Sequence, residues 1–291
     1  MGTRTKSREH QLSAEIEVRP ARAGDESALS KLEFVSKGSD AILVGDRGGE
    51  IVGALGVAPR PFETEILKRK TMHIDVIASP DETVLAPLLS GASKFLFAQG
   101  CRLLTSRRPA GDESIHALQA AGFRLIERLV TLMRPLPMDR QPLPDGVSVA
   151  KAADAEGCAK VAAEAFTFDR FHADPNIEDT AASALKAQWA RNSVNGRADC
   201  VFVTLDDNVI TGFNACLLRG DTAIIDLIGV APGHQGRGFG RALVAAAIAH
   251  YSGKAARMTV GTQDCNVASL SLYNALGFRP SSTAVTLHAH A

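Results

Sequence analysis

The stretch VAPGHQGRGFGRAL, residues 230–243, contains glycine at Gly233, Gly236, Gly238 and Gly240. The apolar run AIIDLIGV leads into it and an alanine-rich run follows it. This order predicts a β-strand, a glycine-rich turn and the start of a helix. Glycine weakens packing and costs backbone entropy on folding, so this density of glycine indicates that another group approaches the backbone closely.

An anion is the group that suits this junction, because backbone N–H groups and the positive end of the helix dipole meet there. Arg237 and Arg241 add charged donors. The Walker pattern fails because no Lys-Ser or Lys-Thr pair follows Gly240, and the dinucleotide fingerprint fails because it needs glycine in place of Arg241. The pattern QxxGxG fits at Gln235, Gly238 and Gly240. We therefore expect a phosphate-binding loop; the other interpretation is a flexible turn before a buried helix.

A second element lies in QDCNVASLSLYNALGF, residues 263–278. Asn266 is a good helix cap. Tyr273 follows it by seven residues, close to two helical turns, so the two side chains lie within about 20° of one another on the helix. The alternative for Tyr273 is a buried tyrosine that donates to a carbonyl.

The strand with QGRGFG and the later N…Y…LGF helix resemble the GNAT superfamily of acetyl-CoA-dependent N-acetyltransferases, over about residues 147–291. The resemblance implies an α/β fold with a mixed sheet and acetyl-CoA as co-substrate. It also implies that Tyr273 protonates the departing thiolate and that Asn266 contacts the coenzyme. The coenzyme-binding residues that it implies are Ile228, Gly229 and Val230 for the pantetheine arm, and Gln235, Gly236, Arg237, Gly238, Phe239, Gly240 and Arg241 for the diphosphate.

The N-terminal half repeats this order in a weaker form. IDVIASP (Ile74–Pro80) matches IDLIGVAP (Ile225–Pro232), but Asp81 and Glu82 follow it in place of the glycine loop. Leu118 stands where the other copy has its tyrosine. We therefore expect a tandem GNAT-like fold whose first copy is degenerate. The expected divisions are a disordered segment over 1–17, the degenerate domain over 18–134, a proline-rich linker over 135–146 and the catalytic domain over 147–291.

The loop FDRFHADPNI, residues 168–177, gives information about the acceptor amine. With the TQxxN and AQWARN stretches, it is similar to acetyltransferases of dTDP-linked 4-amino-sugars, typified by dTDP-fucosamine acetyltransferase. That resemblance implies that Phe171 stacks on a base or sugar and that Arg170 and His172 meet a nucleotide diphosphate. Asp226 either relays a proton from the amine or is a hydrogen-bonded strand carboxylate. A surface loop with an Asp-Pro turn is the plainer interpretation.

Other acceptors remain open, namely a mycothiol-synthase-like substrate, another small-molecule amine and a peptide amine. A non-catalytic acetyl-CoA-binding regulatory module is the alternative from another class. The joint presence of Asn266 and Tyr273 argues against that module, because a binder needs no acid.

Composition limits the partners. Lys+Arg and Asp+Glu both number 32, so no overall basic field favours nucleic acid. No signal-like or membrane-spanning apolar segment occurs, which predicts a cytoplasmic protein without membrane insertion. CxxC and HExxH are absent and the cysteines number five, so free thiols and no metal are expected. The terminal His288 and His290 read as an exposed tail, and the first half offers surface for a homodimer contact.

Overall fold

The computed structural model describes residues 15–36, 39–139 and 141–291. They form two compact units, unit 1 with residues up to Ile126 plus Val285–Ala291, and unit 2 with Glu127–Ala284. Most of the segment 1–17, for which disorder was expected, lies outside the described residues, but Glu17 already begins a strand. Each unit is described by itself below.

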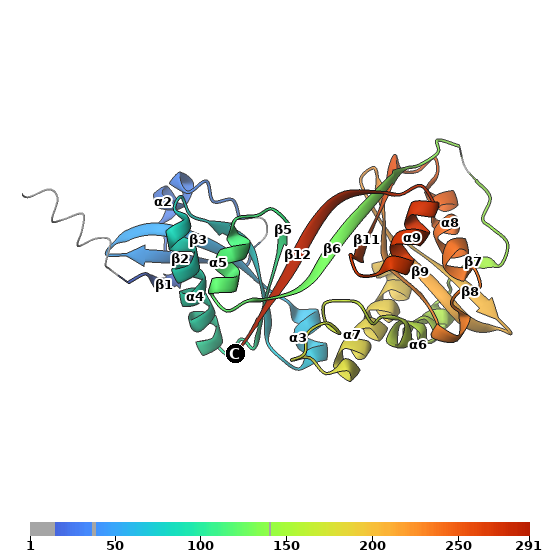
Figure 1. The fold of residues 1–291 in the computed structure, drawn as a ribbon, viewed down its shortest axis with the longest axis horizontal. Helices are drawn as coiled ribbons and strands as arrows, with labels where there is room; N and C mark the ends of the chain where they lie inside the picture. The colour runs from blue at the N-terminus through green and yellow to red at the C-terminus, as the bar shows by residue number, and fades with distance from the viewer. Residues whose placement is uncertain (1–14, 37–38, 140) are drawn as a thin grey trace, which may run out of the picture. The chain divides into compact units, whose positions relative to one another are not determined.

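Unit 1 contains the part of the sheet with strand order β1-β2-β3-β4-β5 (Figure 1). All neighbours are antiparallel except β4 and β5, which are parallel. The elements are β1 (Glu17–Pro20), α2 (Glu26–Lys31), β2 (Ala41–Arg47), β3 (Glu50–Pro59), α3 (Pro61–Leu67), β4 (Thr71–Ala78), α4 (Glu82–Ala98), β5 (Leu103–Pro109) and α5 (Ser114–Ala120).

The core of unit 1 lies between this sheet and the helices α4 and α5. Leu88 and Leu89 of α4 and Leu118 of α5 are fully buried there. Apolar side chains recur every three or four residues along α4, which places them on the face that packs on the sheet. The cluster also takes in Val285 and Leu287, from the far end of the chain.

Unit 2 contains the glycine-rich junction. Its elements begin with β6 (Arg124–Pro135), whose first three residues belong to unit 1, and continue with β7 (Val147–Val149), η1 (Ala152–Asp154), α6 (Ala155–Ala165), α7 (Asp179–Asn192), η2 (Ser193–Arg197), β8 (Cys200–Asp206), β9 (Val209–Arg219), β10 (Thr222–Val230), η3 (Pro232–His234), α8 (Phe239–Tyr251), β11 (Arg257–Gln263), α9 (Val267–Ala275) and β12 (Arg279–His290). The strand order is β6-β11-β10-β9-β8-β7, and only β10 and β11 are parallel.

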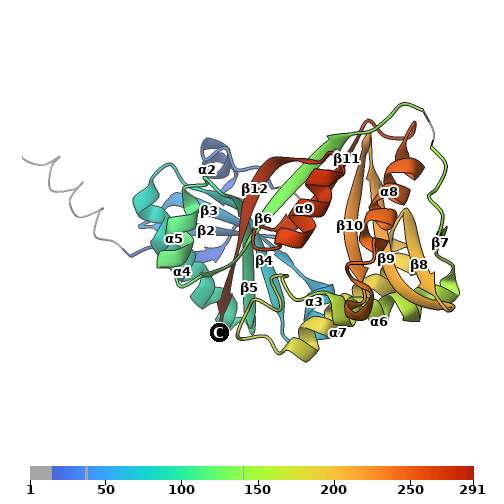
Figure 2. The same cartoon turned by 45° about the vertical axis from the view of Figure 1, so that its right-hand side comes forward.

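Helices cover both faces of the unit 2 sheet (Figure 2). One core packs α8 and α9 against Phe202, Ile225 and Val260. The other packs α6 and α7 against Val203 and Phe213. Residues of opposite parity along β8 and β9 therefore point into different cores, as the pleat of a strand requires. We refer to the two sides as the α8/α9 face and the α6/α7 face.

Strands β6 and β12 each place residues in the unit that is formed mainly by the other half of the sequence. Most of β6, which lies in the N-terminal half of the sequence, pairs with β11 in unit 2 and buries Leu132 there. The end of β12, from Val285, joins unit 1. The linear division at residues 134 and 147 therefore does not coincide with the compact units, because burial of these strands rather than the proline-rich segment sets their limits.

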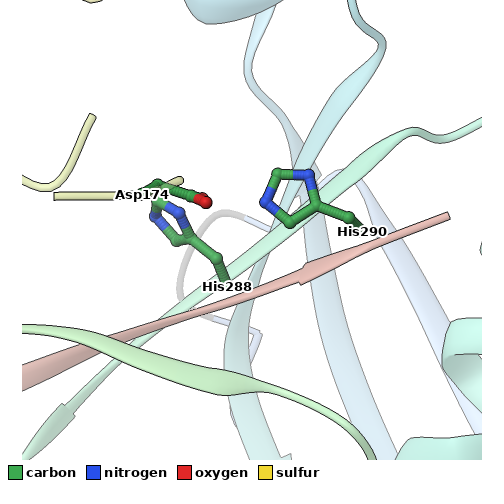
Figure 3. Close-up of side chains that lie close together, drawn as sticks. All are labelled: Asp174, His288 and His290. Carbon is green, nitrogen blue, oxygen red and sulfur yellow. The ribbon is translucent and has the colours of Figure 1, made fainter. Parts of the chain in front are cut away.

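The terminal histidines lie in this last strand and not in an exposed tail. His288 is 1% exposed, and the rings of His288 and His290 are 6.4 Å apart on β12 (Figure 3). Asp174, also drawn in Figure 3, belongs to unit 2. The expectation of a tail was wrong because Val285, Leu287 and Ala289, which alternate with polar residues, supply an apolar strand face.

Candidate active site

Strand β10 pairs with its parallel neighbour β11 over only the first half of its length. Thr222–Ile225 pairs with Arg257–Val260 of β11, and in the described part of the chain the ladder goes no further. On the other side, pairing with β9 continues to Val230, with a register shift between Ile225 and Leu227. The main chain over residues 228–230 thus has one edge paired and one edge outside any ladder, where an extended ligand can add as a strand.

The glycine loop follows this open edge directly. Gly236 has φ +73° and Gly238 has φ +88°, in the left-handed region that strains a residue with a side chain. Gly238 is also the N-cap of α8, so no side chain caps the helix. The first-turn amides of α8 are left to solvent or to a ligand, and with the helix dipole they suit an anion.

Two side-chain contacts connect this loop to neighbouring strands. Gln235 Nε2 donates to the carbonyl of Val230 at 3.1 Å, which ties the loop to the end of β10. Arg237 Nη1 lies 2.9 Å from Asp206 Oδ2, and its guanidinium lies over the Phe239 ring at 5.2 Å. The glutamine of the QxxGxG pattern thus has a local structural role, and Arg241 is exposed in the first turn of α8.

Asn266 caps α9 as the sequence predicts. Its Oδ1 accepts from Ser269 N at 3.1 Å, and α9 begins at the next residue. The cap fixes the phase of the helix, which places Tyr273 in the α8/α9 core together with Ile228 and Val230 of the open strand edge.

Tyr273 is 2% exposed, and its ring meets Phe278 edge to face at 5.7 Å. Burial, with a smaller effect of Cys216, raises the pKa of Tyr273 well above that of a free phenol. Among the described residues its hydroxyl has no hydrogen bond, so the carbonyl partner of a structural tyrosine is not seen. Tyr251, by contrast, donates to Asp199 at 2.7 Å from the end of α8.

The loop on the α6/α7 face is an ordered network. Asp169 Oδ2 lies 2.6 Å from His172 Nδ1, and His172 Nε2 lies 3.3 Å from Ser183 Oγ. Burial opposes ionisation of Asp169, but the His172 hydrogen bond and the Lys186 charge outweigh it and lower the pKa of Asp169 to about 2. Phe171, expected to stack on a ligand, is 1% exposed, with Arg170 over its ring at 4.5 Å.

Lys186 is the functional candidate that the sequence reading missed. Its side chain is buried, 3.5 Å from Asp169, and its ammonium lies 5.1 to 5.8 Å from the rings of Phe166, Phe171 and Trp189. Burial lowers the pKa of Lys186. Its position three residues before Trp189 on α7 was the available signal, since residues at this spacing share a helix face.

Asp226 lies at the register shift of β10, on the α6/α7 face. Its carboxylate accepts from Trp189 Nε1 at 3.2 Å and from Arg197 Nη1 at 2.6 Å. Of the two roles considered for Asp226, the hydrogen-bonded strand carboxylate matches these contacts. A side chain at Gly229 would meet Phe166 at 3.3 Å, so this face approaches the open edge of β10 from the side opposite Tyr273.

In unit 1, β4 and β5 also diverge, but a side chain of the protein itself binds the main chain at the gap. The β4–β5 ladder ends at Ile74 and Ser106, and β4 has its own register shift beside Asp75. Arg108 Nη2 donates to the carbonyls of Ile74 and Asp75 at 3.5 and 3.2 Å. The following helix α4 is capped by Asp81, which accepts from Thr83 N. The gap between the diverging strands and the N-terminus of the following helix are both open in unit 2. In unit 1 both are occupied by side chains of the protein.

Residues 153–278 match the model of the Acetyltransferase (GNAT) family. The fold, the open strand edge and the glycine loop accord with this match, so this region of the chain is an acetyltransferase domain of the GNAT type. Among individual relatives, spore coat polysaccharide biosynthesis protein SpsD of Bacillus subtilis is 28% identical over 221 residues, or 75% of this chain and 76% of that protein. Mycothiol acetyltransferase of Streptomyces avermitilis is 25% identical over 252 residues, or 81% and 80%.

Solved structures confirm the fold. A GCN5-related N-acetyltransferase from Sphaerobacter thermophilus superposes with a TM-score of 0.61 at 14% identity, over 95% of this chain and 96% of that chain. A tandem GNAT protein from the clavulanic acid biosynthesis pathway gives 0.56 at 15% identity, over 95% and 98%. The expected tandem GNAT-like α/β fold is therefore correct. In the described part of the chain, no helix has the length and apolarity needed to cross a bilayer.

Proposed function

We propose that the protein transfers the acetyl group of acetyl-CoA directly to a primary amine, and that the amine is carried by a nucleotide-linked amino-sugar such as a dTDP-4-amino-sugar. The observation that carries the proposal is the convergence, in unit 2, of an open strand edge, an uncapped helix N-terminus and a buried tyrosine. A cytoplasmic location belongs to the same proposal.

The coenzyme fits the residues on the α8/α9 face. The free edge of Ile228, Gly229 and Val230 offers hydrogen bonds to the amides of a pantetheine arm. The diphosphate is assigned to the loop from Gln235 to Arg241, where glycine backbone, helix amides and two guanidinium groups meet. Asn266 caps the neighbouring helix and is assigned a contact with the coenzyme.

Tyr273 is assigned as the general acid. As the amine nitrogen bonds to the carbonyl carbon, the C–S bond breaks and the sulfur takes a proton from Tyr273 Oη. The nitrogen gives up a proton to solvent, and solvent returns a proton to Tyr273. The phenol is protonated at neutral pH even without a shift in its pKa, and the protonated form is the one that can donate. The lack of a hydrogen bond to this hydroxyl in the described chain leaves it available to a ligand atom.

The acceptor is assigned to the α6/α7 face, which reaches the strand edge from the other side. Arg170 and His172 belong to the network that orders the loop, and Asp226 holds Trp189 and Arg197 beside the divergence of β10. The similarity to a polysaccharide biosynthesis protein supports an amino-sugar as the acceptor class.

A second acceptor class is favoured by the similarity to a mycothiol acetyltransferase, which extends over 81% of this chain. The two classes are separated by measuring thiol release from acetyl-CoA with a panel of amines. The panel contains a dTDP-4-amino-sugar, the matching free amino-sugar, a cysteine-linked amino-sugar and a peptide amine. We expect turnover with the nucleotide-linked amine, at a kcat/KM at least tenfold above the others.

Preference for the cysteine-linked amine would replace the proposed acceptor by the second class. Binding of acetyl-CoA without thiol release for any amine would favour the regulatory module instead. Mass spectrometry of the acceptor shows whether the released thiol corresponds to acetylated product.

A further inference from the structure

Asp206 lies at the tip of the β8–β9 hairpin and contacts the loop before α8 at two points. Its Oδ2 is 2.9 Å from Arg237 Nη1 and 3.7 Å from His234 Nε2. These two residues flank Gln235 and Gly236, so one carboxylate lies close to both ends of this short segment of the loop.

The β8–β9 hairpin has a well-defined backbone at Asp206. Asp206 still pairs with Val209 across the ladder, and Asp207 and Asn208 between them have φ +49° and +62°. Positive φ at both central residues belongs to the tight two-residue turn that matches the twist of the strands. The backbone position of Asp206 is thus set by the hairpin and not by the loop that its carboxylate contacts.

Arg237 is held in a position that leaves it able to bind a second anion. Its ion pair uses Nη1, its Cζ lies 5.2 Å from the centroid of the Phe239 ring, and its side chain is 52% exposed. A guanidinium carries five N–H donors, so one ion pair leaves donors for a phosphate. On the other flank, His234 lies 6.2 Å from the same Phe239 ring.

We propose that Asp206 is a positioning residue for the coenzyme diphosphate, which acts by holding Arg237 and His234 so that the glycine loop is already shaped before the coenzyme arrives. This inference rests on the proposed function of the loop and adds a residue from a different hairpin. A carboxylate next to a diphosphate is unfavourable by itself, so its benefit must come through the groups that it fixes. Preorganisation of a flexible loop increases affinity by removing the ordering cost on binding.

The test is an Asp206→Asn variant of the full chain, with Asp207→Asn as the matched control. The control makes the same charge change one residue away, at an exposed turn position. Calorimetry measures the Kd for acetyl-CoA, and steady-state kinetics measure KM and kcat with the best amine of the panel. We expect Asp206→Asn to raise Kd and KM about three- to tenfold, as the loss of an exposed ion pair and its ordering predicts, with kcat unchanged. Asp207→Asn should match the wild type, and Asp206→Glu should recover part of the loss.

A second substrate separates positioning from general damage. S-Acetylpantetheine lacks the diphosphate, so its kcat/KM should be the same for the wild type and Asp206→Asn. In an Arg237→Gln background, Asp206→Asn should raise the Kd for acetyl-CoA less than it does in the wild type, since the two residues act through one contact.

The inference is overturned if Asp206→Asn behaves like Asp207→Asn or binds acetyl-CoA more tightly, which would make the carboxylate a bystander or a competitor for Arg237. Equal losses with both thioesters would also overturn it. If the wild type itself fails to bind acetyl-CoA, the proposed function fails, and this inference fails with it.

Discussion

Arg108 donates a hydrogen bond from Nη2 to the carbonyl oxygen of Asp75 at 3.2 Å, across the gap where β4 and β5 diverge. In unit 2 the corresponding gap follows Ile225 and Val260. The two repeats therefore share a backbone feature and differ in what satisfies it. Protein donors close the first gap, and the second is open along residues 228–230.

One equivalent of acetyl-CoA should bind per chain, in unit 2. Even in Arg108→Ala the Asp81 cap keeps a carboxylate at the start of α4, which repels a diphosphate. Isothermal titration of the full-length wild type and of Arg108→Ala should both give a stoichiometry of one. A second equivalent in either protein would show that unit 1 has kept a coenzyme site.

Replacement of Gly238 by valine should weaken coenzyme binding. Gly238 has φ +88°, so a side chain strains the loop that presents the α8 amides. The KM for acetyl-CoA should rise at least tenfold. Gly220→Val is the matched control, because Gly220 also has positive φ and open space around its Cα but lies in the β9–β10 turn. The assignment of the loop fails if a folded Gly238→Val protein keeps the KM of the control.

Tyr273→Phe keeps the ring packing and removes only the proton. Loss of a general acid costs about 10²–10⁴-fold in rate, or roughly 3 to 5 kcal/mol of barrier. That loss should be found in kcat, with Kd for acetyl-CoA and the melting temperature little changed. Tyr251→Phe, which removes the hydrogen bond to Asp199, should show the reverse, with lower stability and normal kcat. Wild-type turnover by Tyr273→Phe would remove this residue from the mechanism.

Asp169 should stabilise the fold only while it is ionised. Its pKa is lowered from 3.8 to about 2, so its contribution is complete above about pH 5 and is lost as the pH falls through about 2. That difference in pKa corresponds to about 2 kcal/mol. Urea unfolding of the wild type and Asp169→Asn at pH 5 and pH 2.5 should show a gap in unfolding free energy that narrows at the lower pH. A gap independent of pH would mean that the contacts of Asp169 do not depend on its charge.

The sequence allowed the local elements and the repeat to be predicted because these depend on short patterns. The glycine-rich turn lies between a strand and a helix as expected, namely β10 and α8, and Asn266 caps α9 as expected. IDVIASP and IDLIGVAP lie on β4 and β10, each at the strand that leaves its parallel neighbour.

The features that escaped prediction depend on contacts between distant residues. The spacing to Trp189 was visible near Lys186, but nothing there shows that Asp169 and the rings of Phe166 and Phe171 also surround it. The Asp206–Arg237 pair joins a hairpin tip to a loop about thirty residues later. The destinations of β6 and β12 depend on which sheet edge each strand buries, and strand patterns alone do not specify an edge. The roles assigned to Asn266 and Tyr273 remain predictions.

The inclusion of Val285, Leu287 and Ala289 in the core of unit 1 has a consequence for synthesis in the cell. Domains usually fold from the N-terminus while the chain is still emerging from the ribosome. Here the first unit cannot complete its core until residue 289 has been translated, by which point all of unit 2 has also been translated. The two units can therefore complete their cores only at nearly the same point of synthesis, and not one after the other from the N-terminus.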